Sequence, residues 1–196
     1  MPTSIPQDKS NGYEEYAEAF MAARNPCIGP AIIREWMLTL RHGCAILDLG
    51  CGYGVPISEA LIDEGFEVYG VDASATMIEA FLRRFPEAHA QCASVEDSDF
   101  FGRTFDGVVA SGLMFLLSAD VQAHLIHKVA GVLNPNGRFL FTSPQESCTW
   151  YDELTGRDSI SLGSHVYGQI LNAQGFRVVG ERFDEGHNHY FFTLKS

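Results

Sequence analysis

The segment Asp48-Leu49-Gly50-Cys51-Gly52-Tyr53-Gly54 is the strongest indication of the fold in this sequence. It follows an apolar run at residues 44–49, which is typical of a buried parallel strand, and it precedes helical spacing at residues 55–64. Glycines at alternate positions let the backbone approach a ligand closely, and the helix N-terminus behind them attracts negative or polar groups. The stretch therefore predicts a strand–loop–helix unit with a ligand at the loop.

Strand-like and helix-like segments alternate through the rest of the chain. The further predicted strands are residues 67–71, 88–92, 105–110, 138–142, 176–183 and 188–194. The further predicted helices are 13–24, 31–41, 74–84, 119–133 and 164–173, and Ser74 is the predicted N-cap of the helix at 74–84. Such alternation predicts a parallel sheet with right-handed crossovers. Only four residues separate the last two strands, which is too few for a crossover, so these two strands must form an antiparallel hairpin.

We therefore expect an α/β, Rossmann-like three-layer sandwich. Its seven-stranded sheet is mostly parallel and carries an antiparallel C-terminal hairpin strand. The whole chain, residues 1–196, is predicted to form a single domain, with an N-terminal helical cap at 1–42 and the Rossmann-like core at 43–196.

The composition is typical of a soluble protein with one domain. The 196 residues, 46% of them hydrophobic and 19% charged, are enough to bury a core. No run approaches the roughly 18 apolar residues of a membrane span, and residues 1–9 lack the apolar core of a signal peptide. The five cysteines form no Cys-x-x-Cys pair, which favours reduced thiols. We therefore expect a cytoplasmic protein.

The charge restricts the classes of partner. The net charge is −12, and such a field repels polyanions, so neither nucleic acid nor an anionic membrane is an expected partner. No metal site is expected either, because the pair His187 and His189 lacks the third ligand that a site usually needs. A small-molecule substrate is the expected partner, and the sequence does not indicate an oligomeric state.

A carboxylate follows the second predicted strand. Asp72 stands 22 residues after Gly50, where it can accept hydrogen bonds from both hydroxyls of a ribose. A nicotinamide-binding domain has a similar carboxylate, but its fingerprint is Gly-x-Gly-x-x-Gly. Counted from Gly50, the last position of that fingerprint is Val55. The spacing therefore disfavours a dinucleotide.

From about Tyr13 onward the sequence closely resembles the class I S-adenosylmethionine-dependent methyltransferases. The segments that carry the resemblance are Ile46–Gly54, Val71–Met77, Phe105–Ser111 and Leu133–Leu140. The resemblance implies S-adenosylmethionine as the cofactor and methyl transfer as the reaction. It also implies a sheet with a reversed last strand, which agrees with the hairpin expected from the spacing.

The resemblance further implies a set of cofactor contacts. These are Tyr16, Arg24, Asp48, Gly50, Cys51, Gly52, Asp72, Ala73, Met77, Ser94, Val95, Glu96, Ser111 and Leu113. Among them, Asp72 is implied to hold the ribose, and Ala73, Met77 and residues 94–96 to border the adenine. Tyr16 and Arg24 are implied to cover the cofactor from an N-terminal helix. The family often has an aspartate at the position of Ser94, so the sequence departs from the pattern there.

Two polar segments are expected beyond the carboxyl ends of the strands, where open α/β sheets bind ligands. In the first, residues 144–162, we expect Trp150 and Tyr151 to bind the substrate; the alternative is a hydrophobic plug under a loop. In the second, residues 184–190, we expect Glu185, His187 and His189 to line the substrate side, with one histidine as general base. The alternative for the second segment is an ordinary solvated turn.

The sequence thus predicts a methyltransferase that acts on an oxygen, nitrogen or sulfur atom of a small molecule. A protein substrate stays open within the same class. Two other classes also stay open, namely a non-catalytic protein that binds S-adenosylmethionine as the partner of another enzyme, and an NAD-dependent oxidoreductase.

Overall fold

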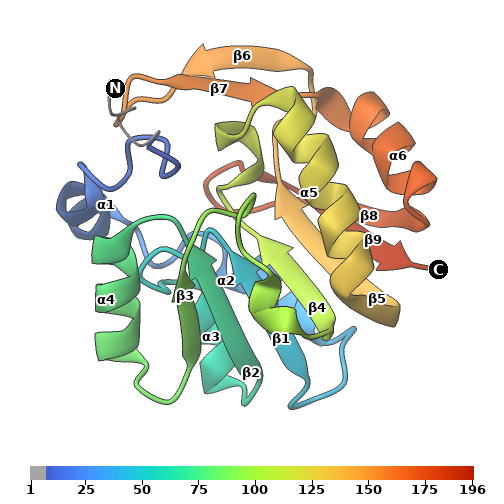
Figure 1. Cartoon of the computed structure of the whole chain (residues 1–196). Coiled ribbons are helices and arrows are strands. Elements are labelled where there is room, and N and C mark those ends of the chain that lie inside the picture. Colours follow the sequence, from blue (N-terminus) through green and yellow to red (C-terminus); the bar gives the residue numbers. More distant parts are fainter. Residues whose placement is uncertain (1–7) are drawn as a thin grey trace, which may run out of the picture.

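The computed structural model describes residues 8–196 and shows a sheet between two layers of helices (Figure 1). The sheet has seven strands in the order β3-β2-β1-β4-β5-β9-β8. Their bounds are β1 (Ala45–Leu49), β2 (Glu67–Asp72), β3 (His89–Cys92), β4 (Phe105–Ala110), β5 (Leu133–Thr142), β8 (Phe176–Phe183) and β9 (His189–Lys195).

The pairing confirms the predicted mixed sheet. Strands β3, β2, β1, β4 and β5 are parallel neighbours, whereas β9 runs antiparallel to both β5 and β8. Strand β8 therefore has the direction of the parallel strands. As a result, the turn between β8 and β9 lies at the edge of the sheet where the parallel strands end, as the spacing predicts.

Each face of the sheet has its own apolar core. Helices α2 (Pro30–Met37), α3 (Ile57–Asp63) and α4 (Ala75–Arg84) bury one face with side chains such as Trp36 and Phe81. Helices α5 (Ala119–Val132) and α6 (Gly163–Ala173) bury the other. Two short 3-10 helices, η1 (Phe100–Gly102) and η2 (Met114–Leu116), also join that second core. The three layers agree with the predicted sandwich, and they leave the carboxyl edge of the sheet to loops.

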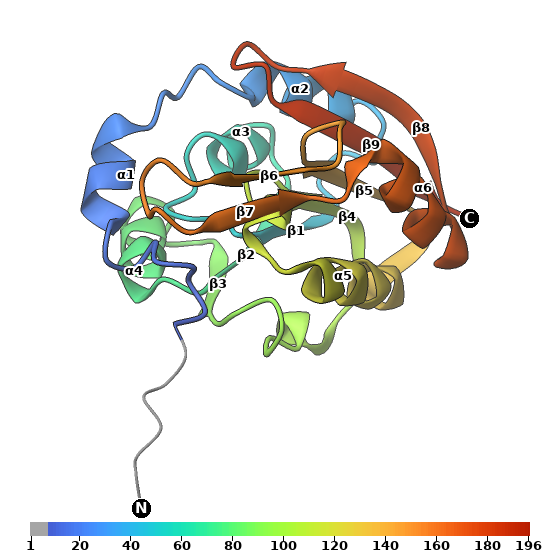
Figure 2. The ribbon, with the colours of Figure 1, turned by 90° about the horizontal axis from the view of Figure 1, so that it is seen from above.

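A second, two-stranded sheet lies over that edge, and the sequence did not predict it. It consists of β6 (Cys148–Tyr151) and β7 (Asp158–Ser161), which pair antiparallel and pass above the ends of the large sheet (Figure 2). Gln122 of α5 anchors it, because the side-chain nitrogen donates to the backbone oxygen of Ile160 at 2.9 Å. The predicted loop at 144–162 is therefore an ordered hairpin.

The N-terminal region is less helical than predicted. Helix α1 covers only Ala17–Ala23, and residues 8–16 form turns, which we call the strap. The strap lies beside the tip of the β6–β7 hairpin, residues 152–157, and hydrogen bonds join the two. Residues 1–7 of the predicted helical cap lie outside the described part of the chain. Across residues 8–196, the structure has no helix of the length and apolarity that crossing a bilayer requires.

Candidate functional site

A cavity of about 220 Å³ opens at the carboxyl edge of the sheet. Its floor comes from the loop after β1 and from the ends of β2 and β4, and the strap and the residues around η2 complete its wall. The cavity therefore lies where the topology of an open α/β sheet places a ligand.

The glycine loop of residues 50–54 forms part of the floor. Gly50, Gly52 and Gly54 all have left-handed backbone angles, with φ of 67°, 54° and 88°. A Cβ on Gly50 would stand 3.0 Å from the Cβ of Leu113, which itself lines the cavity. Glycine is thus needed both for the turn and for the close approach of the loop to the end of β4.

Asp72 lies at the end of β2, and its carboxylate is held by the backbone. Its Oδ2 accepts from the Gly52 nitrogen at 2.8 Å, and its Oδ1 accepts from the Ser74 nitrogen at 2.8 Å. Burial raises the pKa of Asp72, while these two hydrogen bonds oppose the rise. Each oxygen has a further lone pair, so the oriented carboxylate can still accept hydrogen bonds from a ligand.

Asp48 lies beneath the glycine loop and is almost completely buried, with 2% of its surface exposed. Its Oδ2 accepts from the Ser58 hydroxyl at 2.6 Å. Burial raises its pKa to about 7; the Ser58 bond opposes the rise and the charge of Asp72 adds to it. A buried carboxylate that accepts one side-chain hydrogen bond lowers the stability of the fold. Because Asp48 also lines the cavity, it is a candidate for a functional role there.

The predicted adenine contacts come together at one end of the cavity. Ala73 and Met77 line it from the start of α4, and residues 94–96 line it after β3. The helix begins there because the Ser74 hydroxyl accepts from the Met77 nitrogen at 3.1 Å, as the predicted N-cap requires. Ser94 is not free for a ligand hydrogen bond in the way an aspartate is, since its hydroxyl donates to Asp97 at 2.8 Å.

The other end of the cavity contains residues that the sequence analysis missed. Ser111 and Leu113 line it as expected, but Thr142, Asn188 and Tyr190 line it as well. The Tyr190 hydroxyl lies 3.3 Å from the Ser111 hydroxyl. Burial raises the pKa of Tyr190 to about 12, so the phenol stays protonated at neutral pH. Its alternating position on the reversed strand is the one signal in the sequence that it faces the sheet interior.

One of the two predicted N-terminal contacts lines the cavity, and the other does not. Arg24 lines the cavity, but Tyr16 does not; it stands just before α1, and its side chain is exposed. Tyr13, three residues earlier, lines the cavity instead, and its ring packs edge-on against Phe20. The difference arises because α1 begins only at Ala17, so residues before it follow the turns of the strap.

The three predicted catalytic residues do not line the cavity. His189 is buried with 3% exposure, and its two ring nitrogens contact the backbone oxygen of Ser143 at 3.1 Å and the Glu181 carboxylate at 2.8 Å. Glu185 accepts from the Gly29 nitrogen at 3.3 Å, and His187 is exposed in the turn with φ of 59°. From this turn and the start of β9, the residues that line the cavity are Asn188 and Tyr190.

The two predicted substrate-binding aromatics are also outside the cavity lining. Trp150 packs at 5.4 Å between ring centroids on Phe115, which itself lines the cavity. Tyr151 is 75% exposed. Alternate residues on a strand point to opposite faces, so the hairpin β6–β7 supports the cavity wall through Trp150 and turns Tyr151 to solvent.

Comparisons with known proteins agree with this geometry. Residues 46–137 match a family model described as a methyltransferase domain. Mouse glycine N-methyltransferase is 30% identical over 155 residues, which cover 68% of this chain and 51% of that protein. A ubiquinone biosynthesis O-methyltransferase of Coxiella burnetii (strain Dugway 5J108-111) is 27% identical over 147 residues, covering 70% of this chain and 61% of that protein. The chain spans about half the length of the first curated relatives it matches.

Solved structures share the fold at low identity. The 1,6-didemethyltoxoflavin-N1-methyltransferase of Burkholderia thailandensis, solved with its substrate and S-adenosylhomocysteine, aligns over all of this chain and 92% of its own, with a TM-score of 0.74 and 18% identity. A TehB-like methyltransferase of Corynebacterium glutamicum aligns over 95% of this chain and 97% of its own, with a TM-score of 0.69 and 21% identity. The matched methyltransferase-domain model contains the glycine loop and Asp72 of the cavity floor, and the chain shares its fold with these solved methyltransferases.

Proposed function

We propose that this chain binds S-adenosylmethionine and transfers its methyl group to a small-molecule nucleophile. The observation that carries the proposal is that the carboxylate of Asp72 and the glycine loop lie side by side in one cavity at the carboxyl edge of the sheet. A carboxylate in this place can accept hydrogen bonds from ribose hydroxyls. Val55, where a dinucleotide fingerprint has its third glycine, favours S-adenosylmethionine over NAD.

The residues of the floor divide the work of binding. When bound, S-adenosylmethionine supplies a methyl group that its sulfonium already activates, so the protein chiefly positions and desolvates the reactants. The glycine loop lies against the methionine part, with Asp48 beneath it. Asp72 accepts from the ribose, and Ala73 and Met77 flank the adenine.

The residues at the other end of the cavity face the substrate. Ser111, Asn188 and Tyr190 offer hydrogen bonds there, and Arg24 is a cation that can pair with a carboxylate of the ligand. Tyr190 serves as a hydrogen-bond donor rather than a base, because its pKa is raised to about 12. The cavity lining within residues 8–196 contains no histidine, so the proposal assigns no general base and relies on alignment of the nucleophile with the sulfonium.

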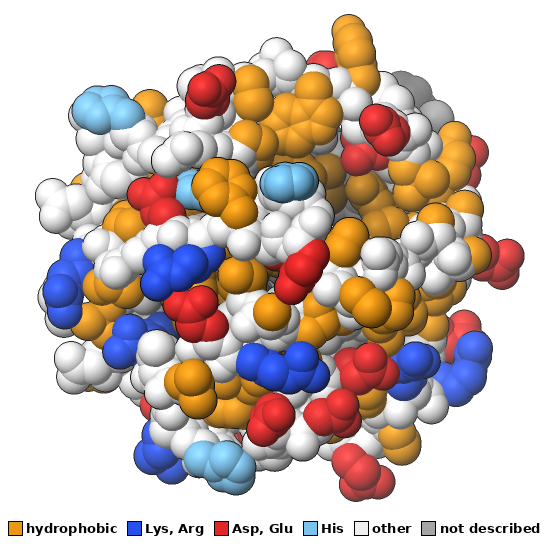
Figure 3. Space-filling view, turned by 180° about the vertical axis from the view of Figure 1, so that it is seen from behind, with side chains coloured by type: hydrophobic (Ala, Val, Ile, Leu, Met, Phe, Trp, Pro, Cys, Tyr) orange, Lys and Arg blue, Asp and Glu red, His pale blue; other side chains and the backbone are white. Residues whose placement is uncertain are grey.

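Three observations support a small molecule over a macromolecule. The strap forms part of the cavity wall, and the tip of the β6–β7 hairpin is bonded to the strap, so the cavity is bordered closely by the chain, which suits a small substrate. On the face in Figure 3, Lys and Arg side chains lie among acidic ones rather than in one basic area, and the net charge is −12. The relatives named after glycine and ubiquinone biosynthesis are methyltransferases whose names refer to small molecules.

The second candidate is a non-catalytic protein that only binds the cofactor. Such a protein needs no space beyond the methyl group, whereas this cavity continues to Ser111, Thr142 and Tyr190. That continuation favours an enzyme.

Two measurements test the proposed function. Calorimetry is expected to detect binding of S-adenosylmethionine and S-adenosylhomocysteine, and NAD binding in their place would overturn the cofactor. A screen with methyl-labelled S-adenosylmethionine and metabolite extracts is expected to yield a labelled small molecule. Labelling of protein alone would mean that the substrate is a protein and not a small molecule. Cofactor binding without any methyl transfer would favour the non-catalytic candidate.

A further inference from the structure

The side-chain amide of Asn11 is a further polar group at the cavity. Asn11 of the strap contributes to the cavity wall, and its backbone is left-handed with φ of 52°. Among the partners that residues 8–196 offer, the buried side-chain nitrogen Nδ2 of Asn11 finds none. Buried donors in folded proteins nearly always have a partner, so this one points to a group that residues 8–196 do not supply. The last side-chain bond of an amide rotates easily, so the amide can adjust to a ligand in the cavity that Asn11 lines.

Two anchors place Asn11 over one half of the cavity. Before it, Lys9 donates to the Glu96 carboxylate at 2.8 Å. After it, Glu14 accepts from the Thr76 hydroxyl at 2.8 Å and from the Ser74 hydroxyl. Glu96 follows β3 and Ser74 follows β2, and these two segments flank the end of the cavity that holds the adenosine under the proposed function. Asn11 lies between the two anchors, so the adenosine half is the part of the ligand within its reach.

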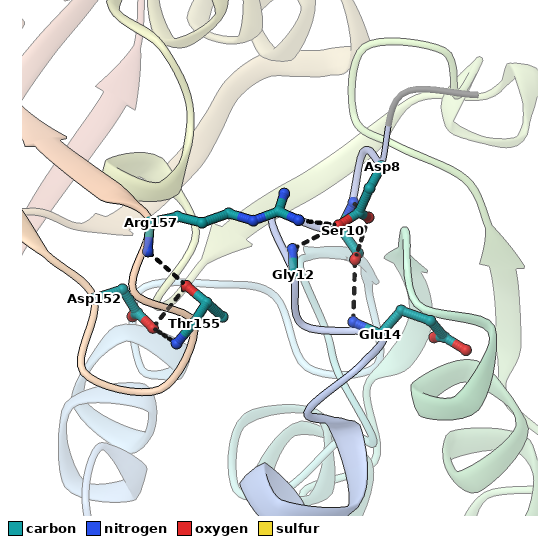
Figure 4. A network of polar contacts seen from close by, with 7 residues as sticks. All are labelled: Asp8, Ser10, Gly12, Glu14, Asp152, Thr155 and Arg157. Carbon is teal, nitrogen blue, oxygen red and sulfur yellow. Dashed lines mark hydrogen bonds and ion pairs between the residues drawn. The ribbon is translucent and has the colours of Figure 1, made fainter. Parts of the chain in front are cut away.

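A third set of contacts fixes the shape of the strap. Arg157 at the hairpin tip donates to Asp8 Oδ2 at 2.7 Å, and Asp8 also accepts from the Gly12 nitrogen at 2.9 Å (Figure 4). Tyr13 donates to Asp152 Oδ2 at 3.0 Å. These bonds enclose the turn that contains Asn11 on both sides, so the hairpin tip determines where the amide lies.

We propose that Asn11 binds the ligand, by donating a hydrogen bond from its side-chain amide to an acceptor atom on the adenosine half of an S-adenosyl compound. Arg157 is a positioning residue, which acts through Asp8 and the strap. The proposal rests on the proposed function, because it assumes that the cavity holds such a compound. It assigns the N-terminal strap to the binding site, in addition to the loops at the ends of the strands.

The first test replaces Asn11 with glycine and measures the Kd for S-adenosylhomocysteine by calorimetry. Glycine adopts the left-handed backbone readily, so Asn11→Gly removes the amide without straining the turn. We expect the Kd to rise about three- to tenfold, the size of one hydrogen bond, with an unchanged thermal midpoint of the ligand-free protein. The matched control is Asn136→Gly, another left-handed asparagine (φ of 63°) that lies outside the cavity lining, and it should leave the Kd unchanged.

The second test examines positioning. Arg157→Ala should speed the dissociation of S-adenosylhomocysteine several-fold. The control is Arg83→Ala, which breaks an exposed ion pair between Arg83 and Glu79 on α4 whose length is similar to that of the Arg157–Asp8 pair, and it should not change the dissociation rate. Because Arg157 acts through Asn11, adding Arg157→Ala to Asn11→Gly should weaken binding by less than the product of the two separate losses. A merely structural role of Arg157 predicts that the two losses multiply.

The outcomes separate this proposal from the proposed function. If the wild-type protein binds S-adenosylhomocysteine and Asn11→Gly binds it equally tightly, the role of Asn11 is overturned and the proposed function stands. If the wild-type protein does not bind S-adenosylhomocysteine at all, the proposed function and this assignment are both overturned. Multiplying losses in the double variant would leave Asn11 as a contact and remove Arg157 from the account.

Discussion

The floor and the roof of the cavity contain carboxylates whose pKa values shift in opposite directions. In the floor, burial raises the pKa of Asp48 to about 7 and also raises that of Asp72. In the roof, formed by the strap and the hairpin tip, hydrogen bonds lower the pKa of Asp8, first from Ser10, and of Glu14, first from Ser74. The ionised floor carboxylates therefore lower the stability of the folded protein, whereas the ionised roof carboxylates raise it.

The opposite pKa shifts separate carboxylates that have a ligand-binding role under the proposed function from carboxylates that stabilise the fold. A carboxylate whose burial weakens the ligand-free fold is a candidate for a functional role, and the proposed function gives Asp72 the role of accepting hydrogen bonds from the ligand. The roof charges are exposed, so salt and acid weaken their contacts. The contacts of the roof therefore depend on salt and pH more than the buried packing of the floor does.

The largest expected effect is on the floor. Gly54→Ala places a Cβ 2.5 Å from Phe85 and 2.9 Å from Phe81, at a left-handed position. Overpacking and backbone strain together should lower the free energy of unfolding by about 2–4 kcal/mol in urea titrations. The control is Gly102→Ala, which has a similar backbone (φ +61°) but nothing within 4 Å of its Cβ. Equal losses in the two variants would mean that packing under the loop is not the cause.

The next effect concerns pH. The pKa of Asp48 is about 7 in the folded protein and about 3.9 in an unfolded chain, so the folded state binds the proton more tightly. Stability from this group is therefore present below pH 4 and is lost as the pH rises toward 7. Between about pH 5 and pH 8 the wild-type free energy of unfolding should fall by on the order of 2 kcal/mol more than that of Asp48→Asn. Parallel pH profiles of the two proteins would contradict the shift.

A smaller effect is expected on affinity. Asp72→Ala removes the acceptor for the ribose hydroxyls and should raise the Kd for S-adenosylhomocysteine about tenfold or more, which is about 1.4 kcal/mol or more. Asp106→Ala is the control, since this aspartate lies on β4 outside the cavity lining. Wild-type affinity in Asp72→Ala would remove the ribose role and weaken the argument that buried carboxylates mark the ligand.

The smallest effect is expected on the roof. Gly12→Ala sets a Cβ 3.1 Å from Arg157 Nε and 3.2 Å from Thr155, at φ of +90°. These neighbours are side chains of a surface hairpin that can move, so the free energy of unfolding should fall by less than about 1 kcal/mol. Dissociation of S-adenosylhomocysteine should nevertheless become faster. A loss of stability as large as that of Gly54→Ala would show that roof and floor are equally rigid.

The floor could be predicted from the sequence because its geometry is local. A glycine loop between a strand and a helix, and a carboxylate at the end of the next strand, are read from consecutive residues. The fold followed from the alternation of segments, and the hairpin of β8 and β9 followed from its short turn. Ser74 as N-cap of α4 was likewise visible in the sequence.

The roof could not be predicted because it depends on distant pairs. Asp8 and Arg157 are separated by 149 positions, and no local pattern announces their contact. The strands of the β6–β7 hairpin have four residues each and lack clear alternation. The turn at 184–188 also depends on contacts that the sequence does not reveal: the Asp184 carboxylate accepts from the nitrogens of Gly186 and Asn188 at 2.9 Å, and Glu185, His187 and His189 do not line the cavity.

The position of β9 between β5 and β8 has a consequence for biosynthesis. Ribosomes make β9 after every other strand of the sheet, and β8 has no other neighbour in it. Until β9 emerges, β5 is an open edge with the apolar side chains of Phe139 and Phe141, and β8 cannot join the sheet. Unpaired apolar edges can pair with other chains. The nascent protein is therefore most prone to aggregate in the period before β9 emerges from the ribosome.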